Sequence, residues 1–358
     1  MRLLFVGKRH PQQRDLIERP YGRFHHLPVE LSTLGHEVQV LLCSHRHLPS
    51  TRTRIADVDW LNEDIRTLGV GDFFRRLSRH AAEFRPDWIV GMSDTYYGWI
   101  ANGLGRTTGA RVAIDAYDNY EAYMPWNLPL HAFWRRSIRA ADLVTAAGPQ
   151  LAQRLQSHRR GGRPVEIIPM AADPEFRPLD KQACRRTLGL PAEGRLVGYV
   201  GSWARNRGTT MLIDSFRQAR AVRPDLQLVL SGKPPPEALA EPGVVSTGYV
   251  PDAQLPDVIN ALDVACVVTA DTSFGRYSYP AKLCEAMACH VPVVATDTEP
   301  VRWMLAGSTD HLVQHGDAAS FAKRMLDLLD APRAEYGPRP TWQDQALKLD
   351  QLFSEVVR

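Results

Sequence analysis

The sequence predicts an α/β protein of two domains, each built on a doubly wound parallel sheet. The chain has 358 residues, and roughly 150 residues per domain indicates two domains. Short apolar runs alternate with helical patterns in both halves, which is typical of successive β-α-β units. An irregular, proline-containing segment, MAADPEFRPLDK, separates the two halves as a linker would.

Composition and charge exclude several classes of protein. Hydrophobic residues make up 44% of the chain, which excludes global disorder, and a net charge of +3 argues against nucleic acid as the main partner. The five cysteines are scattered without a C-x-x-C pair, so we expect buried thiols in a reducing compartment. The start, MRLLFVGKRH, has too short an apolar run for a signal peptide, and no run approaches the ~18 residues of a membrane span. We therefore expect a cytoplasmic protein, and any membrane contact would be peripheral, at the inner face.

Hydrophobic patterning assigns the elements in order. The expected strands of the first half are 3–6, 38–43, 88–92, 111–115, 143–146 and 165–169. Helical patterns between them cover 72–84, 97–107, 133–140 and 149–156, and a further helix lies in FHHLPVELSTLGHEV. The second half gives strands at 196–200, 226–230, 244–247, 264–268 and 292–295, and helices at 209–221, 253–261, 281–289 and 318–329.

These elements divide the chain into domains. We expect an N-terminal domain over 1–175 and a C-terminal domain over 176–335. A final helix, 336–358, begins with a capping-box-like Thr341 and Asp344 and lies outside the strand–helix rhythm of the second domain.

A basic, glycine-bounded loop follows the first strand of the second half, in VGYVGSWARNRGTTMLIDSF. Gly201 and Gly208 let an anion approach the backbone, and the helix after the loop offers free N–H groups. Arg205 and Arg207 add positive charge to the same loop. The alternative is a solvated loop with two incidental arginines.

A second segment, PAKLCEAMACHVPVVATD, combines a helix start with a buried strand. Pro280 suits the first turn of a helix, which leaves the N–H groups of Lys282 and Leu283 available to an anion. Glu285 falls in the second turn, where a carboxylate can accept hydrogen bonds from sugar hydroxyls. The alternative is that Lys282 and Glu285 form a surface i,i+3 ion pair.

Together these segments resemble the donor domain of GT-B glycosyltransferases, above all the GT4 family. PAKLCEAMACHVPVVATD resembles the family's P-x-K-x-x-E-A-M-A-C-G-x-P-V-V-A-T signature. LVLSGKPPPE and VVSTGYVPDAQLPDVINALDVACV resemble its next strands and their loops. The first half matches more loosely, in LPVELSTLGHEVQVL, AADLVTAAGPQLAQRL and EIIPMAADPEFRP.

The resemblance implies a fold and an activity. We expect two Rossmann-like domains facing a cleft, with the last helix crossing back to the first domain. The activity would be hexosyl-type transfer, with retention, from a UDP- or GDP-sugar to a glycan, lipid-linked or small-molecule acceptor. The nucleotide sugar is a substrate, and no cofactor or bound metal is expected.

The resemblance also assigns roles to single residues. The diphosphate would meet Gly201, Arg205, Arg207, Lys282 and Leu283, and the ribose hydroxyls would meet Glu285. The base would meet the backbone at Tyr249 and Val250, beside Gly232 and Lys233.

The sequence departs from the family near the transferred sugar. Retaining members usually have E-x7-E, and counting back from Glu285 gives Tyr277 in the first position. An alignment on Phe274-Gly275 gives Thr272 instead, next to Asp271, so Asp271 is the acidic candidate.

The first domain and the end of the signature helix depart from the family too. Where the family often has a histidine, this chain has Tyr117 within Asp115-Ala116-Tyr117-Asp118. Asp115 and Asp118 are therefore candidate catalytic residues. Asp118 would orient a substrate or act as a base, or it would only cap the loop. His290 replaces the glycine that ends the signature helix, and we expect a helix cap there with positive φ.

Two further functions remain open from the sequence, an inactive nucleotide-sugar-binding relative and a GT-B epimerase. The Arg- and His-rich segments RHPQQRDLIERPYGRFHH and DFFRRLSRH are either solvated faces or contacts with an anionic membrane and a lipid-linked acceptor.

Overall fold

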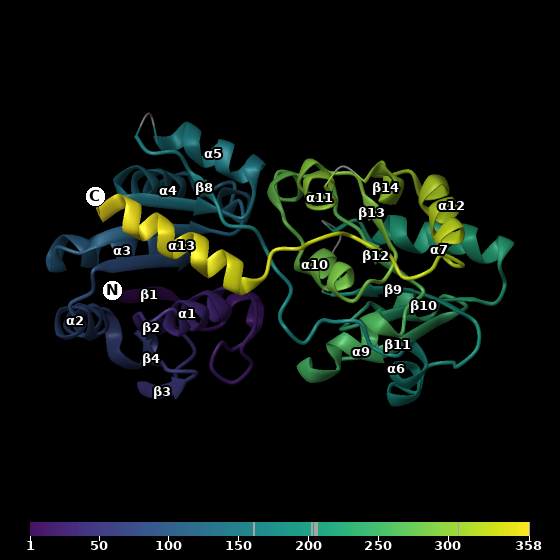
Figure 1. Ribbon diagram of the computed structural model, residues 1–358, viewed down its shortest axis with the longest axis horizontal. Coiled ribbons are helices and arrows are strands. Elements are labelled where there is room, and N and C mark those ends of the chain that lie inside the picture. The colour runs from purple at the N-terminus through teal and green to yellow at the C-terminus, as the bar shows by residue number, and fades with distance from the viewer. Residues whose placement is uncertain (160–161, 202, 204–206, 307, 358) are drawn as a thin grey trace. The chain divides into compact units, whose positions relative to one another are not determined.

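In a computed structural model the chain folds as two compact units (Figure 1). Unit 1 comprises residues 1–170 together with 340–358, and unit 2 comprises 171–339. The structure describes residues 1–159, 162–201, 203, 207–306 and 308–357.

Unit 1 is built on an eight-stranded sheet with the order β3-β4-β2-β1-β5-β6-β7-β8. All neighbouring strands are parallel except β3 and β4, which form an antiparallel pair at one edge. The strands are β1 (Arg2–Lys8), β2 (Glu37–Ser44), β3 (Thr51–Ile55), β4 (Val58–Asp64), β5 (Trp88–Ser93), β6 (Arg111–Ala116), β7 (Leu143–Ala146) and β8 (Glu166–Ile167). The middle of β1 is buried throughout, as expected for a parallel strand covered on both faces.

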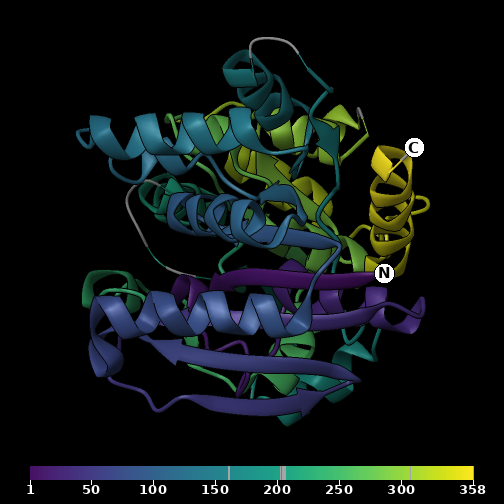
Figure 2. The ribbon, with the colours of Figure 1, turned by 90° about the vertical axis from the view of Figure 1, so that its left-hand side faces the viewer.

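Helices connect these strands and cover the sheet. They are α1 (Arg23–Thr33), α2 (Ile65–Phe84), α3 (Thr95–Thr108), α4 (Leu128–Ala140) and α5 (Pro149–Arg159), with short 3₁₀ turns η1 (Pro11–Gln13) and η2 (Tyr120–Ala122). Helix α3 packs between α2 and α4, so these three form one continuous layer (Figure 2).

The last helix, α13 (Trp342–Val357), packs on unit 1 at the amino ends of several strands. The Phe353 ring lies 4.8 Å from the Trp88 ring at the start of β5. Asp350 is hydrogen-bonded to the ring of His36, just before β2, at 2.9 Å. The final helix thus returns to the first half of the chain, as the expected fold requires.

Unit 2 is built on a six-stranded, all-parallel sheet with the order β11-β10-β9-β12-β13-β14. Its strands are β9 (Arg195–Val200), β10 (Leu226–Ser231), β11 (Val244–Gly248), β12 (Val264–Val267), β13 (Val293–Thr296) and β14 (Leu312–Val313). Its helices are α6 (Lys181–Thr187), α7 (Thr209–Val222), α8 (Pro236–Leu239), α9 (Leu255–Asn260), α10 (Ala281–Ala288), α11 (Glu299–Met304) and α12 (Ala318–Leu328), with 3₁₀ turns η4 (Asp252–Gln254), η5 (Gly275–Tyr277) and η6 (Thr309–His311). Helices α7 and α12 pack together, and Phe216 and Phe321 are fully buried with Tyr199 in the same core.

The sequence did not predict the hairpin of β3 and β4. Strand β3 is TRTRI, a polar edge strand that is mostly exposed and has no apolar alternation to reveal it. Strand β4 ends in polar residues that are nonetheless buried, since they have partners: Glu63 pairs with His80 at 2.8 Å, and Asp64 accepts hydrogen bonds from the first amides of α2. Helix α2 consequently begins at Ile65 rather than near residue 72, with a break at Gly69.

Two other expectations have clear outcomes. All five cysteines are free and buried, which confirms the expected buried thiols. The arginines and histidines of RHPQQRDLIERPYGRFHH are partly internal, because Arg9 and Arg23 are buried and paired with acids and so do not belong to a solvated basic face. Among the described residues, no helix has the length and apolar character needed to cross a bilayer.

Replacing Phe353 by alanine should lower the free energy of unfolding of unit 1 by about 3 to 5 kcal/mol, because it removes a fully buried ring from the contact between α13 and β5. Hydrogen exchange of the α13 amides and urea unfolding measure the loss. The control is Leu347→Ala on the same helix, where the side chain is 48% exposed and the change should stay within about 0.5 kcal/mol. Equal effects of the two substitutions would contradict this account of how α13 is held.

Candidate functional site

The order of the strands reverses once in each sheet, and ligands of such sheets bind beyond the carboxyl ends of the strands at that point. In unit 1 the reversal lies between β1 and β5, and in unit 2 between β9 and β12. The predicted diphosphate residues that the structure describes, Gly201, Arg207, Lys282 and Leu283, lie around the carboxyl end of β9. The candidate acids Asp115 and Asp118 lie at or just beyond the carboxyl end of β6.

Lys282 is the strongest feature of the site in unit 2. It lies in the first turn of α10, and its ammonium nitrogen is buried without a hydrogen-bond partner among the described residues. The nitrogen lies 4.1 Å from the centre of the Tyr199 ring, a cation–π contact. Burial and, after it, the positive charge of Arg207 lower the pKa of Lys282 to about 7, while Glu285 opposes the shift. A buried cation in this condition favours an anion beside it, because an anion would replace the lost solvation.

Gly201 makes room for this lysine. It follows β9 with a φ of +143°, and a Cβ atom at this position would lie 2.5 Å from the Lys282 ammonium nitrogen. Gly232, after β10, approaches Gly201 in turn: its own Cβ would lie 3.2 Å from the Gly201 carbonyl oxygen. Glycine at both positions therefore permits a close approach of backbone and lysine that other residues would block.

Arg207 supplies a second positive charge. Its guanidinium carbon lies 5.8 Å from the centre of the Phe274 ring, and Gly208 directly after it forms the N-cap of α7 with a φ of +78°. The start of a helix, an arginine and Lys282 thus occur on one side of unit 2, which favours an anion. Arg205, the other predicted arginine, lies outside the described residues.

The start of α10 corrects one expectation and supports another. The Leu283 amide donates to the Pro280 carbonyl at 3.0 Å, so it is not available to an anion as predicted. The reason is a tight turn at the N-terminus of α10, in which the Leu283 N–H already has a backbone acceptor. Glu285 lies one turn beyond Lys282 and is partly exposed. Because the Lys282 ammonium is buried, the interpretation of Lys282 and Glu285 as a solvated surface pair is excluded.

The segments predicted to meet a base lie side by side. The Gly232 amide donates to the Gly248 carbonyl at 2.8 Å, which joins the loop after β10 to the end of β11. Tyr249 follows Gly248 and is 61% exposed, whereas the next residue, Val250, is buried. Lys233 is exposed on the neighbouring loop. The structure therefore brings these four predicted positions together at one edge of the sheet.

The three candidates for the sugar-contacting position have different surroundings. Asp271 is exposed and pairs with Arg276 at 2.6 Å, and this contact lowers the pKa of Asp271. The Thr272 hydroxyl accepts from the Gly275 amide at 3.1 Å and stabilises the turn before η5. Tyr277 ends η5 and is partly exposed. Of the three, only Asp271 offers a charged oxygen to a ligand.

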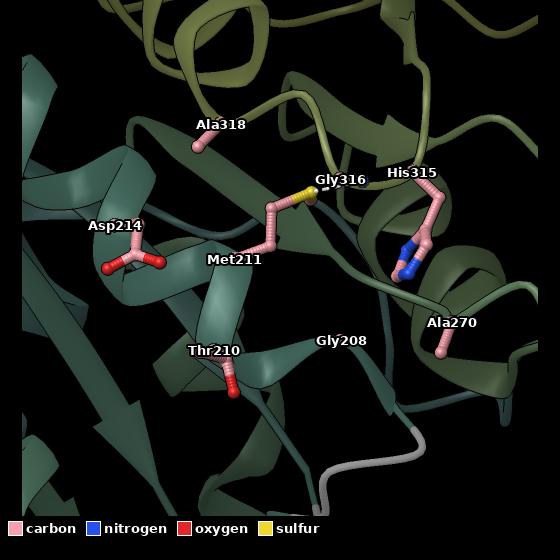
Figure 3. Close-up of a pocket in the computed structure, with 8 residues that line it drawn as sticks. All are labelled: Gly208, Thr210, Met211, Asp214, Ala270, His315, Gly316 and Ala318. Atoms are coloured by element: carbon pink, nitrogen blue, oxygen red, sulfur yellow. Dashed lines mark hydrogen bonds between the residues drawn. The ribbon is translucent and has the colours of Figure 1, made fainter.

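A pocket of about 320 Å³ opens beside the start of α7 (Figure 3). The His315 ring lies on the same side of this pocket as Ala270, and the Gly316 amide donates to the Met211 sulfur at 3.1 Å. The charge of His315 also contributes to the lowered pKa of Asp271, after Arg276. The pocket is lined by Gly208, Thr210, Met211, Asp214, Ala270, His315, Gly316 and Ala318. His315 was missed from the sequence, because a single histidine after an edge strand gives no signal.

Asp115 in unit 1 is part of a buried ion pair. Its two oxygens accept from the Arg23 guanidinium at 2.8 and 2.6 Å, and one of them also accepts from the Thr145 hydroxyl at 2.6 Å. Arg23 donates in addition to the Ile168 carbonyl at 3.1 Å. This network ties α1 to β6, β7 and the end of β8. Its geometry gives Asp115 a structural role rather than contact with a substrate.

Asp118 has a different environment. It is buried just before η2 and accepts a hydrogen bond from the Tyr123 hydroxyl at 2.7 Å. Tyr117, in the position of the family histidine, stacks edge-on against Phe24 and accepts from the Gln12 side chain at 2.9 Å. Asp118 therefore remains the candidate acid of unit 1.

Asp94 and Lys8 were missed in this region. They follow β5 and end β1, on the two sides of the point where the strand order reverses. Asp94 caps α3 by accepting from the Tyr96 amide at 3.1 Å, and burial raises its pKa while Lys8 opposes the rise. An aspartate between an apolar strand and a helix start is the sequence signal that could have found it.

His290 directly follows Cys289, the C-cap of α10, and its φ of +58° confirms the expected cap, in which histidine takes the left-handed conformation usual for glycine. Among the described residues, no group of three or more His, Cys, Asp or Glu side chains has the arrangement of a metal site.

Both halves of the chain match known families. Residues 24–176 match the family described as Glycosyltransferase Family 4, and residues 194–331 match the family described as Glycosyl transferases group 1. The D-inositol 3-phosphate glycosyltransferase of Stackebrandtia nassauensis is 28% identical over 245 residues, which cover 60% of this chain and 54% of that protein. The phosphatidyl-myo-inositol mannosyltransferase of Mycobacterium leprae is 32% identical over 225 residues, 58% of each chain. The chain spans about half the length of the curated relatives it matches.

Solved structures resemble the whole chain. The sucrose-phosphate synthase of Thermosynechococcus elongatus superposes with a TM-score of 0.71 at 17% identity, covering 99% of both chains. Anabaena HepE in complex with UDP-glucose gives a TM-score of 0.70 at 16% identity, covering 100% of this chain and 99% of that one. Two parallel-sheet units with these neighbours define the GT-B fold. With the two family matches, the chain belongs to the GT4-like glycosyltransferases of that fold.

Replacing Asp115 by asparagine should lower the free energy of unfolding by about 3 to 5 kcal/mol, because the Arg23 guanidinium stays buried without its counter-charge. Urea unfolding measures this, and the control is Arg52→Ala, which breaks a surface pair with Asp59 and should cost at most about 1 kcal/mol. If Asp115→Asn abolished activity while leaving stability unchanged, the structural role would be refuted.

Proposed function

We propose that unit 2 binds a nucleotide diphosphate sugar and that the chain transfers the sugar to an acceptor bound by unit 1. The observation that supports this most directly is the buried, hydrogen-bond-deficient ammonium of Lys282, beside Gly201 and near the charge of Arg207. A diphosphate would supply the missing counter-charge and acceptors.

The same groups suit the chemistry of transfer. When the bond between sugar and diphosphate breaks, negative charge builds on the leaving diphosphate. Lys282, Arg207 and the start of α7 are fixed positive groups that would stabilise this charge more in the transition state than in the ground state. The positive groups would thus promote the reaction as well as binding.

The remaining donor contacts follow from the neighbouring segments. Glu285, one turn beyond Lys282, would accept from the ribose hydroxyls. The backbone at Tyr249 and Val250, next to Gly232, would meet the base of a UDP- or GDP-sugar. Asp271 is the group proposed at the sugar, because it is the charged candidate that faces solvent there.

The acceptor is proposed to be a hydroxyl-bearing glycan, lipid-linked or small molecule. Two relatives are named for inositol-containing acceptors, which supports a polyol hydroxyl as the attacking group. Asp118 would orient that hydroxyl or accept its proton. Retention of configuration is proposed on the resemblance to the GT4 family.

Binding of UDP or GDP should weaken as the pH rises above about 7. Below that pH Lys282 is already charged in the free protein, whereas above it each complex must first take up a proton, which costs about tenfold in affinity per pH unit. The loss should level off at the higher pKa that the ammonium has beside bound phosphate. Isothermal titration calorimetry from pH 6 to 9, in buffers of different ionisation enthalpy, measures affinity and proton uptake.

The matched variants are Lys282→Met and Lys323→Met. Lys323 is an exposed lysine of α12 that pairs with Asp327, so its loss should leave the pH profile unchanged. Lys282→Met should bind more weakly and should lose the slope above pH 7. A slope that survives in Lys282→Met would refute the assignment of Lys282.

A nucleotide sugar that raises the melting temperature identifies the donor, because ligand binding stabilises the folded state by mass action.

Release of nucleoside diphosphate from that donor should fall by about 100-fold in Glu285→Ala and Arg207→Ala, since each removes a contact to the diphosphate nucleotide. Arg217→Ala, on the exposed face of α7 and paired with Glu241, is the control and should keep activity.

Other outcomes distinguish other functions. Tight donor binding without release in the presence of varied acceptors would indicate an inactive relative. Interconversion of the sugar without an acceptor would indicate an epimerase.

A further inference from the structure

Unit 1 exposes large apolar side chains in one region. Among its described residues, eight large apolar side chains are exposed, and seven of them lie on α2, α3, α4 or the segment 120–127 that leads into α4. The most exposed is Trp126 at 76%, followed by Leu128 at 70%. Trp99, Tyr96 and Phe133 are between 44% and 52% exposed. Apolar surface gathered in one layer of a folded unit marks an interaction site.

The exposed residues follow helical spacing on the outer side of this layer. On α3, Tyr96 and Trp99 are three positions apart, and Arg106 lies seven positions further on, so all three share one stripe. On α4, Phe133 and Arg136 are three positions apart and share a stripe as well. The Trp99 ring contacts the Phe74 ring of α2 edge-on at 5.7 Å, which joins the stripes of α2 and α3.

The same three helices are strongly basic. They contain eight arginines and two acidic residues, in a chain whose net charge is only +3. Four of the arginines, Arg66, Arg106, Arg136 and Arg139, are exposed and form no ion pair with an acid in the described part of the chain. This layer therefore combines exposed aromatic rings with unneutralised positive charge, and we name it the aromatic–arginine face.

We propose that the aromatic–arginine face of α2, α3 and α4 docks on the surface of an anionic lipid bilayer. Tryptophan, tyrosine and phenylalanine favour the level of the lipid headgroups, where an apolar ring and a polar edge are both satisfied. Arginines beside them are attracted by the negative surface potential of anionic lipids. The positive charge and the aromatic rings thus both favour an anionic bilayer. This proposal does not depend on what unit 2 binds.

Vesicle flotation of the full chain tests the assignment. Vesicles of phosphatidylcholine alone are compared with vesicles in which about a third of the lipid is phosphatidylglycerol. Binding is expected to the anionic vesicles, weakly or not at all to the neutral ones, and should fall as salt is raised. Arg136→Ala combined with Arg139→Ala should weaken it by about 30-fold, and Trp99→Ala combined with Phe133→Ala by about tenfold or more.

Matched controls come from unit 2. Trp303→Ala removes an exposed tryptophan and Lys323→Ala an exposed cation, and both should leave vesicle binding unchanged. All variants should melt at the temperature of the unchanged protein and bind the nucleotide as it does, so failure on vesicles is distinguishable from failure of the donor site.

Three results would overturn the proposal. They are an absence of vesicle binding, equal binding to neutral and anionic vesicles, and an equal loss in the control variants. Binding to soluble heparin but not to vesicles would also overturn it, because the face would then serve a polyanionic chain rather than a bilayer.

Discussion

The donor site proposed for unit 2 depends on one contact, between the Lys282 ammonium and the backbone of Gly201. A lysine nitrogen that is buried against the Tyr199 ring, with a pKa near 7, is costly to keep charged. The lack of a Cβ atom at Gly201 lets the lysine reach this position, and the start of α10 fixes its direction. The positive groups of the proposed donor site are thus already in place in the folded protein, so little rearrangement would be needed for a phosphate to bind.

Parallel sheets explain why the site can be assembled from distant segments. Each β-α-β unit returns the chain to the same edge, so the ends of β9, β10, β11 and β12 contribute neighbouring loops. Unit 1 uses the equivalent edge differently. There, Asp115 forms an ion pair with Arg23. A residue that the family resemblance made a catalytic candidate therefore connects α1 to the sheet. Asp118, three residues later, instead accepts a hydrogen bond from the Tyr123 hydroxyl.

Features set by local sequence patterns were predicted, whereas features that depend on contacts between distant residues were missed. Proline before a lysine and a glutamate, followed by an apolar strand, predicted α10 and the neighbourhood of Lys282. The use of the Leu283 amide by Pro280 was not predictable, since it depends on the detailed turn. The arginines at 9 and 23 looked like surface charges, but Arg23 meets an aspartate 92 positions away. Strand β3 was missed because its side chains are polar and it lies at the edge of the sheet, beside β4.

The exposed rings of α3 and α4 were also not predictable from the sequence. Helix α3 contains the buried Tyr97 as well as the exposed Trp99, and α4 contains the buried Trp134 next to the exposed Phe133. Periodicity alone does not separate an outward ring from an inward one at the margin of an apolar stripe. Only the packing of α2, α3 and α4 against one another determines which rings reach solvent.

The division of the chain has a consequence for its biosynthesis. Unit 1 begins at the first residue and is completed by 340–358, so all of unit 2 is an insertion within it. A ribosome that has made residues 1–170 has not yet made α13, so the contacts of Trp88 with Phe353 and of His36 with Asp350 form only after α13 has emerged. Unit 2, whose strands and helices are continuous in sequence, can fold first. The first segment of unit 1 is therefore synthesised before unit 2, but unit 1 is completed only after unit 2.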